Sequence, residues 1–268
     1  MDNPSLIKKY IRFTETTFCP GCGNGIILNC FIRAVEHLKL DPKNILCVSG
    51  IGCSSWIPSP YLKLDTFHTL HGRAIAFATG AKVFKNELNV VVFTGDGDGA
   101  GIGGNHLIHG ARRNIDMTVL LVNNSIYGMT GGQFAPTTPY GAHTSTSIHG
   151  NQERPFDLCK LVKAAGGTYV ARWTTNYPRK LIESIEEALS HKGFAFIEIL
   201  TQCPTEYGRK NKIESPVEYF KYLNQITTLK REEGKKIPLG VFINVKKPEF
   251  TENLDLIIEK LSSSISLY

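Results

Sequence analysis

The sequence contains no long apolar run. No stretch of its 268 residues approaches the roughly 20 apolar residues of a membrane-spanning helix. The first residues, MDNPSLIKKYIRF, also lack the apolar core of a secretory signal peptide. We therefore expect a protein that does not bind a membrane, with the cytoplasm as its default location.

The sequence also lacks internal repeats and a stripe of Lys and Arg interleaved with aromatic residues. Nucleic-acid binding is therefore not expected. The composition, 42% hydrophobic and 20% charged, is ordinary for a globular protein and allows one large domain or two small ones. The net charge of +6 indicates either a solvated basic surface or one that attracts an acidic partner or anionic substrates.

Seven cysteines in a chain without a signal peptide argue against a disulfide framework. Three of them have apolar neighbours and are expected to be small core residues: Cys30, Cys47 and Cys159. The other four lie beside turn residues: Cys19, Cys22, Cys53 and Cys203.

The C-x-x-C pair of Cys19 and Cys22 has three common uses, as a redox dithiol, half a zinc site or half an iron–sulfur site. A dithiol leaves Cys53 and Cys203 unexplained, and a zinc ribbon normally has a second C-x-x-C. Single thiolates from distant loops suit a cluster seated on a folded domain, and iron–sulfur clusters generally take four thiolates. The spacing favours a cluster, while a zinc site or no metal at all stays open.

Short apolar runs alternate along the chain with segments of helical periodicity. The pattern predicts strands over 44–49, 88–94, 117–123, 168–171 and 194–200, and helices over 26–38, 72–85, 101–113, 157–166, 178–192 and 253–262. Loops are expected over 56–70 and 125–156, and a polar tail that wraps the body or a partner over 204–240. This alternation predicts an α/β fold with a doubly wound, mostly parallel sheet.

Two polar motifs follow predicted strands of this sheet. Gly95-Asp96-Gly97 ends the apolar run at 90–93, and Asn124, 28 positions after Asp96, ends the run at 119–122. Open α/β sheets bind ligands at such strand ends. A carboxylate and an amide oxygen can share Mg²⁺ with substrate phosphates. The pair therefore predicts a diphosphate cofactor held through Mg²⁺.

Other interpretations of this region are weaker. Residues 99–104 contain G-x-G-x-x-G, but the next strand ends in Asn124 instead of the acid that a dinucleotide site requires. An EF-hand is excluded because the twelfth position from Asp96 is Leu107. His68 and His71 precede a predicted helix start, where they either serve an anion site or act as ordinary polar caps.

Taken together, these residues resemble the β subunit of the 2-oxoacid:ferredoxin oxidoreductases, in particular the 2-oxoglutarate type. The resemblance covers most of residues 15–215, and the last 50 residues carry little of it. The matching stretches are TFCPGCGNGIIL (17–28), GIGCSS (50–55), HTLHGRA (68–74), GDGDGAGIGGNHLIHGARRNID (95–116), NNSIYGMTGGQ (123–133) and TQCPTEYGRKN (201–211).

The resemblance implies a thiamine diphosphate-binding α/β domain over 1–215 and an extension over 216–268 that packs on the body or on a partner subunit. It implies that Asp96, Asn124 and the carbonyl of Ile126 bind Mg²⁺, and that His71 is catalytic. The implied ligands of a [4Fe–4S] cluster are Cys19, Cys22, Cys53 and Cys203. The implied cofactor-binding residues are Gly52, Ser54, His71, Gly72, Gly95, Gly97, Asp98, Tyr127, Gly128 and Thr130.

The implied reaction converts a 2-oxoacid and CoA to acyl-CoA and CO₂ and passes electrons through the cluster to ferredoxin. The cofactor supplies the chemistry and the protein supplies position and electrostatics. Loop 125–156 would help to exclude water. In this family an α subunit supplies the glutamate that activates the thiamine, so the chain alone is expected to be inactive.

One residue departs from the family. Relatives often have a basic or polar side chain near position 56, whereas Trp56 cannot pair with the distal carboxylate of 2-oxoglutarate. Pyruvate, branched-chain and aryl 2-oxoacids are therefore alternative substrates, unless another group such as Arg73 binds that carboxylate. A further alternative is a non-catalytic, metal-bearing assembly subunit in which Asp96 and Asn124 have no ligand.

Overall fold

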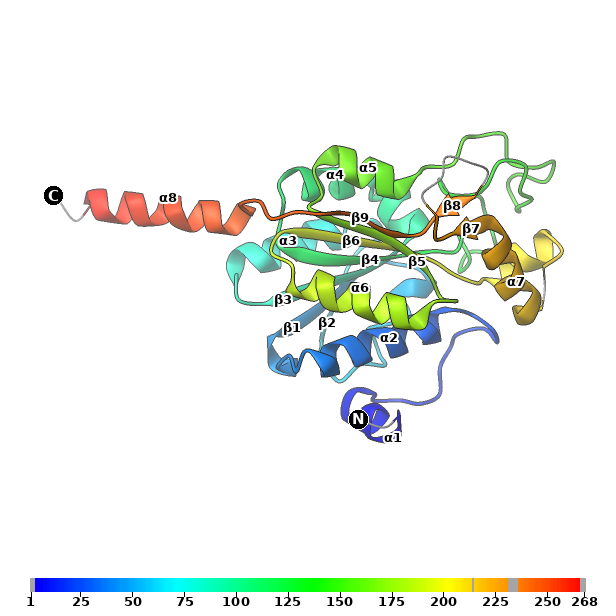
Figure 1. Ribbon diagram of the computed structural model, residues 1–268, viewed down its shortest axis with the longest axis horizontal. Helices are drawn as coiled ribbons and strands as arrows, with labels where there is room; N and C mark the ends of the chain where they lie inside the picture. The colour runs from blue at the N-terminus through cyan, green and yellow to red at the C-terminus, as the bar shows by residue number, and fades with distance from the viewer. Residues whose placement is uncertain (1–2, 214, 231–235, 266–268) are drawn as a thin grey trace.

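The computed structural model of the chain describes residues 3–213, 215–230 and 236–265. A seven-stranded sheet with the order β2-β1-β3-β4-β6-β5-β9 forms its centre (Figure 1). All neighbouring strands are parallel except β9, which pairs antiparallel with β5. The strands are β1 (Ile45–Ser49), β2 (Asp65–His68), β3 (Asn89–Gly95), β4 (Met117–Asn123), β5 (Tyr169–Thr174), β6 (Phe194–Leu200) and β9 (Gly240–Asn244).

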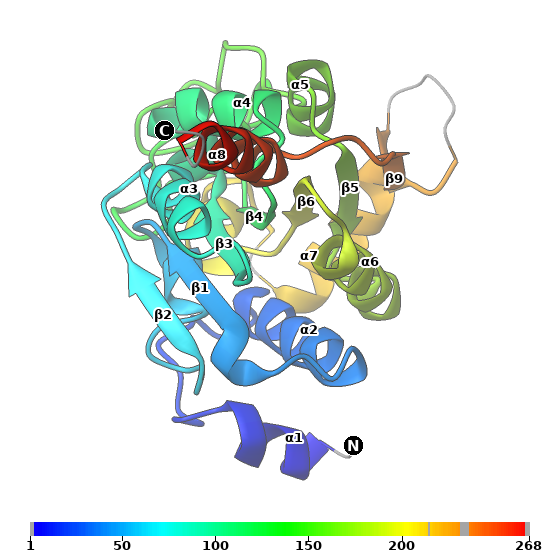
Figure 2. The ribbon, with the colours of Figure 1, turned by 90° about the vertical axis from the view of Figure 1, so that its left-hand side faces the viewer.

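Helices cover both faces of this sheet (Figures 1 and 2). One face packs on α2 (Asn24–His37) and α6 (Pro178–Ser190), with α1 (Asn3–Tyr10) packed against α2, and the other face packs on α3 (Ala74–Phe84), α4 (Gly104–Arg112) and α5 (Leu158–Ala165). Because both faces are covered, β4 and β6 are buried along their whole length, as their mostly apolar sequences require. The predicted doubly wound α/β fold is confirmed.

The strand order determines where a ligand can bind on this sheet. β1 has β2 on one side and β3 on the other, so the crevice between the carboxyl ends of β1 and β3 is a topological switch point. Ligands of open α/β sheets bind in this position. The predicted polar motifs after β3 and β4 therefore lie at the edge where a ligand is expected.

The structure corrects several expected boundaries. Residues 65–68 form the edge strand β2, and the loop expected there was wrong, because all four residues are exposed and show no apolar alternation. The helix expected over 101–113 begins at Gly104, after a π-helical turn (η3, Gly97–Ile102). No regular helix or strand is found in 125–156, where Tyr127 and Gln133 make an isolated bridge.

The described residues of the segment expected as a polar tail pack closely on the body. The segment contains the turn η4 (Pro204–Gly208), α7 (Pro216–Ile226), the short strands β7 (Thr227–Thr228) and β8 (Ile237–Pro238), and β9. Tyr219 and Leu223 of α7 are buried in the core. The terminal helix α8 (Phe250–Ile265) extends away from the body (Figure 1). In the described part of the chain, no helix is long and apolar enough to span a membrane.

Candidate functional site

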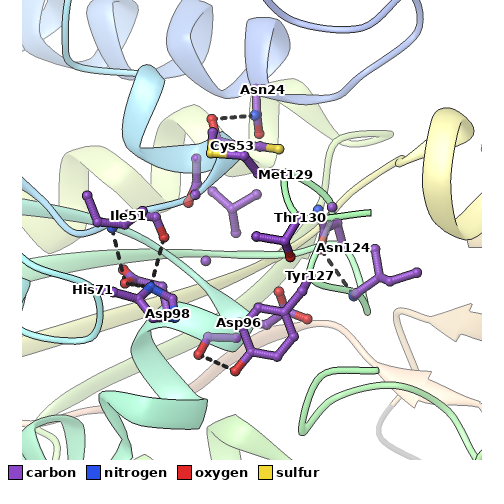
Figure 3. A pocket seen from close by; sticks show the side chains of 17 residues that line it. Asn24, Ile51, Cys53, His71, Asp96, Asp98, Asn124, Tyr127, Met129 and Thr130 are labelled. Carbon is purple, nitrogen blue, oxygen red and sulfur yellow. Dashed lines mark hydrogen bonds and ion pairs between the residues drawn. The ribbon is translucent and has the colours of Figure 1, made fainter. Parts of the chain in front are cut away.

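A cavity of about 300 Å³ lies at the carboxyl ends of β1, β3 and β4 (Figure 3). Thirteen residues were predicted to bind the cofactor or Mg²⁺, and all except Gly72 line this cavity. They come from the turn after β1, the start of α3, the turn after β3 and the loop after β4. Folding thus brings together segments that are up to about 80 positions apart in the sequence.

Asp96 is a buried carboxylate beside this cavity, with 2% of its surface exposed. Burial raises the pKa of its carboxyl to about 7, although hydrogen bonds from Thr137 and from Gly97 oppose the shift. Asp96 is in no ion pair with the described residues. The amide oxygen of Asn124 lies on the same cavity and accepts a hydrogen bond from the Ile126 backbone N–H at 3.2 Å. This donor set suits a hard divalent cation.

Glycines allow the backbone to form the cavity wall. Gly52 has a φ of 139°, in the region that favours glycine, and a Cβ on it would meet open space. A Cβ on Gly97 would lie 2.3 Å from the Tyr127 ring. The Tyr127 hydroxyl instead donates to the Gly97 carbonyl at 2.9 Å. The close fit of the ring on the turn after β3 therefore depends on glycine.

Asp98 joins the segments around the cavity. Its Oδ1 accepts from the backbone N–H of Gly72 at 2.6 Å and of Ile51 at 3.2 Å, and its Oδ2 accepts from the Thr94 hydroxyl at 2.5 Å. His71 Nδ1 lies 2.8 Å from Asp98 Oδ1. The hydrogen bonds of this carboxylate thus connect the segments around the cavity and orient His71. A phosphate could therefore contact Asp98 only through its backbone.

The four turn cysteines line an adjoining cavity of about 340 Å³. Burial raises the pKa of the Cys53 thiol to about 11 and of Cys22 to about 12, and it also raises the pKa of Cys203. Buried thiolates therefore need a compensating positive charge, such as a bound metal centre. Cys30, Cys47 and Cys159 are buried in the core, as predicted.

The four thiols come from three segments of the chain and surround one cavity. Among the described residues, no three His, Cys, Asp or Glu side chains meet at one point as the ligands of one metal ion do. Four sulfurs around a cavity suit the wider body of an iron–sulfur cluster. A Cβ on Gly128 would lie 3.5 Å from the Cys53 sulfur and 3.8 Å from that of Cys203, so this glycine borders the thiols closely.

Trp56 and Arg73 take different places. Trp56 is partly exposed and lines the cavity of the cysteines, not the cavity of Asp96. The Arg73 guanidinium donates to the carbonyls of Gly72 and Ile102, each at 3.3 Å. Which of the two contacts a substrate stays a prediction.

Sequence reasoning missed several residues that support the site. Asn24 lines both cavities and donates to the Cys53 carbonyl at 3.1 Å, and Thr137 donates to Asp96. Arg172 and Glu198 are buried behind the loop after β4. Their signal was present in the sequence, since each is a charged residue within an otherwise apolar strand, YVARWT and FAFIEIL.

Comparison with known proteins gives consistent matches. The family described as "Thiamine pyrophosphate enzyme, C-terminal TPP binding domain" matches residues 50–199. The chain is 54% identical to the 2-oxoglutarate synthase subunit KorB of Methanocaldococcus jannaschii, over 97% of this chain and 99% of that protein. It is 40% identical to the 2-oxoacid:ferredoxin oxidoreductase 2, subunit beta, of Aeropyrum pernix, over 90% and 84%.

A solved structure also matches. It is the 2-oxoglutarate:ferredoxin oxidoreductase from Magnetococcus marinus with 2-oxoglutarate, coenzyme A and succinyl-CoA bound. The TM-score is 0.88 at 38% sequence identity, and the match covers 95% of this chain and 90% of that one. The likeness therefore extends over nearly the whole fold, including strands and helices that surround both cavities.

Proposed function

Because this chain belongs to the β subunits of the 2-oxoacid:ferredoxin oxidoreductases, we propose that it forms the thiamine- and cluster-binding half of an enzyme that oxidises 2-oxoglutarate with CoA. The observation that carries this proposal is that the cavity of Asp96 and the cavity of the four cysteines adjoin each other and share lining residues. Both are lined by Asn24, Cys53, Asn124, Gly128 and Met129. A diphosphate cofactor and an electron acceptor can thus lie next to each other.

In this proposal Asp96, Asn124 and the Ile126 carbonyl hold Mg²⁺, and the backbone turns at Gly52 and Gly97 hold the diphosphate. Other residues that line the cofactor are Ser54, Gly72, Gly95, Asp98, Tyr127, Gly128 and Thr130. Bound thiamine diphosphate supplies the carbon nucleophile for decarboxylation. The buried, cation-free carboxylate of Asp96 and the glycine-built wall support this assignment.

His71 is the proposed catalytic residue of this chain. Asp98 holds its Nδ1 at 2.8 Å, while the side chain remains partly exposed at the cavity. The imidazole is thereby oriented with Nε2 as the ring atom left for the substrate. An oriented histidine in a cavity can hold or move a proton at this atom.

Cys19, Cys22, Cys53 and Cys203 are the proposed ligands of a [4Fe–4S] cluster. Such a cluster supplies a one-electron carrier between the thiamine site and ferredoxin. Cys19 is exposed, unlike its three partners, so it marks the side on which electrons can leave. The net charge of +6 favours an acidic ferredoxin as the partner.

A companion α subunit completes the site in this proposal. The residues that line the cavity of Asp96 in the described chain include no glutamate. Four apolar side chains on or beside the two cavities are substantially exposed, which suits coverage by a partner: Ile51, Trp56, Ile102 and Met129. We retain 1–215 as the cofactor-binding unit and 216–268 as its extension, which reaches the body through α7 and β9.

Thiamine diphosphate binding tests the proposal directly. In the complex purified with its companion subunit, Asp96→Ala is expected to abolish Mg²⁺-dependent thiamine diphosphate binding in calorimetry, because it removes the only charged Mg²⁺ ligand in the proposed set. Asp65→Ala, at an exposed aspartate on the edge strand β2, is the matched control and should bind normally. Normal binding by Asp96→Ala would instead support the non-catalytic assembly subunit.

A further inference from the structure

We propose that Asn123, Glu198 and Arg172 position the Mg²⁺ ligands Asn124 and Ile126 by holding Ser125 in a left-handed conformation. We call these three residues the sheet-end relay. The inference rests on the proposed Mg²⁺ site and goes beyond it. It assigns a task to three residues that do not line the cofactor cavity.

The relay crosses three neighbouring strands. Arg172 on β5 and Glu198 on β6 are direct register partners, and Arg172 Nε donates to Glu198 Oε2 at 2.6 Å. Asn123 at the end of β4 donates from Nδ2 to the other oxygen, Oε1, at 2.7 Å. Asp157 anchors the far end, accepting from Arg172 Nη2 at 2.5 Å. Each side chain is therefore held by the next.

These groups are expensive to bury. Arg172 and Glu198 have exposed fractions of 3% and 2%, in strands that are otherwise almost entirely apolar. Apolar residues of similar volume often stabilise a core as well as or better than a buried ion pair. Stability alone therefore gives little reason for this pair, whereas the hydrogen bond of Glu198 to Asn123, the last residue of β4 and the neighbour of Asn124, connects the pair to the site.

The residue on which the relay acts is Ser125, which has a φ of +62° although it is not glycine. This conformation is unfavourable for residues with a Cβ and persists where surrounding contacts enforce it. Asn123 Oδ1 accepts from the Ser125 backbone N–H at 3.0 Å, as in an Asx turn. On the opposite side, the Thr138 hydroxyl donates to the Ser125 carbonyl at 2.7 Å.

Ser125 lies between two of the proposed Mg²⁺ ligands, so its backbone conformation affects how both are oriented. Asn124 and Ile126, which flank it, line the cavity of Asp96, whereas Ser125 lines a separate cavity together with Asn123, Arg172 and Glu198. Successive residues of this segment thus line two different cavities in alternation. The relay is on the far side from the cofactor, so its members are positioning residues, not catalytic residues.

The test is the Mg²⁺ dependence of thiamine diphosphate binding by the complex of this chain with its companion subunit. Asn123→Ala should raise the Mg²⁺ concentration for half-maximal binding by about tenfold, the usual scale for residues that orient metal ligands. Adding Ser125→Gly should bring it back to within about threefold of wild type, because glycine adopts positive φ without strain. Thr138→Val loosens the same residue from the other side and should also weaken Mg²⁺ binding.

Asp116→Asn is the matched control. It breaks a buried ion pair between Asp116, directly before β4, and Lys82 of helix α3, and neither residue lines the two cavities. The variant should lower the unfolding temperature without changing Mg²⁺ dependence. Wild-type Mg²⁺ dependence in Asn123→Ala would overturn the relay, whatever the result for Thr138→Val, because Thr138 is not one of its members. A defect in Asn123→Ala that Ser125→Gly does not relieve would overturn the role of the left-handed conformation.

The Asp96→Ala variant separates this inference from the proposed function. If Asp96→Ala keeps wild-type Mg²⁺ dependence, the Mg²⁺ site itself is wrong and the relay falls with it. If Asp96→Ala loses Mg²⁺-dependent binding while the relay variants keep it, only the relay is wrong.

Discussion

Three buried aspartates show how neighbouring side chains decide what one residue type does. Asp96 faces a cavity that no lysine or arginine of the described chain lines, and Asp98 accepts hydrogen bonds from three chain segments. Asp116 is paired with Lys82 at 2.6 Å and accepts from the Gly193 backbone N–H at 3.1 Å. The first suits a metal, the second builds the walls of the site, and the third stabilises the fold.

Asp116→Asn should lower the free energy of unfolding by about 3 kcal/mol at pH 7, because it leaves the buried Lys82 ammonium without its counterion. Burial alone would raise the pKa of Asp116, but Lys82 holds it below its ordinary value of 3.8. A lowered pKa contributes stability above the ordinary value that is lost as the pH falls through the folded value.

The difference between wild type and Asp116→Asn should therefore be full at neutral pH and shrink as the pH falls below about 4. Denaturant unfolding between neutral and acid pH measures it. A difference that stays constant over this range would mean that Asp116 does not titrate with a lowered pKa.

Cysteines of the same chain should also behave differently according to their surroundings. In anaerobically purified complex, this chain should contribute about four irons with matching acid-labile sulfide. Cys203→Ser should lose most of them, since it removes one of four thiolates. Cys47→Ser, in the core, should keep the iron while lowering stability. About one zinc without sulfide would contradict the cluster and favour the zinc alternative.

At the scale of elements, β6 and α8 represent two extremes of burial. Every residue of β6 is buried, whereas α8 extends from the body (Figure 1) with exposed apolar residues: Leu256, Ile257, Ile258 and Leu261. The Glu249 side chain caps this helix by accepting from the Thr251 backbone N–H at 2.8 Å. Local capping thus supports a helix that makes few contacts with the body.

Ile197→Ala in β6 should lower the free energy of unfolding by about 3 kcal/mol, because it opens a cavity in a close-packed core. Ile258→Glu in α8, where the side chain is 58% exposed, should change it by less than about 0.5 kcal/mol. Denaturant unfolding of the chain measures both. A large loss in Ile258→Glu would show that α8 packs on the body in solution.

At the scale of the whole molecule, the two cavities share one wall and have exposed apolar residues around them, including Trp56 and Met129. The isolated chain loaded with thiamine diphosphate should show no 2-oxoglutarate-dependent reduction of ferredoxin, because the activating glutamate is expected from the α subunit. Adding that subunit should restore turnover. Full turnover by the isolated chain would refute the need for a partner.

Much of this molecule was predictable from local sequence. β1, β3 and β4 are largely apolar runs that end in glycine or asparagine turns, and β6 is a largely apolar run as well. Burial on both faces leaves such runs little freedom to form anything else. Because parallel strands end at one edge, the sequence alone was enough to place Asp96 and Asn124 together. The motifs also identified the family correctly.

Only the tertiary structure decided the rest. β2 is exposed and carries no apolar signal, so its pairing with β1 depends on backbone hydrogen bonds between distant segments. The cavity that Trp56 lines and the reach of Glu198 to Asn123 likewise depend on strand order and register. Hydrophobic periodicity is a property of a short segment, whereas strand order, cavities and buried polar contacts arise only when segments far apart in the chain pack together.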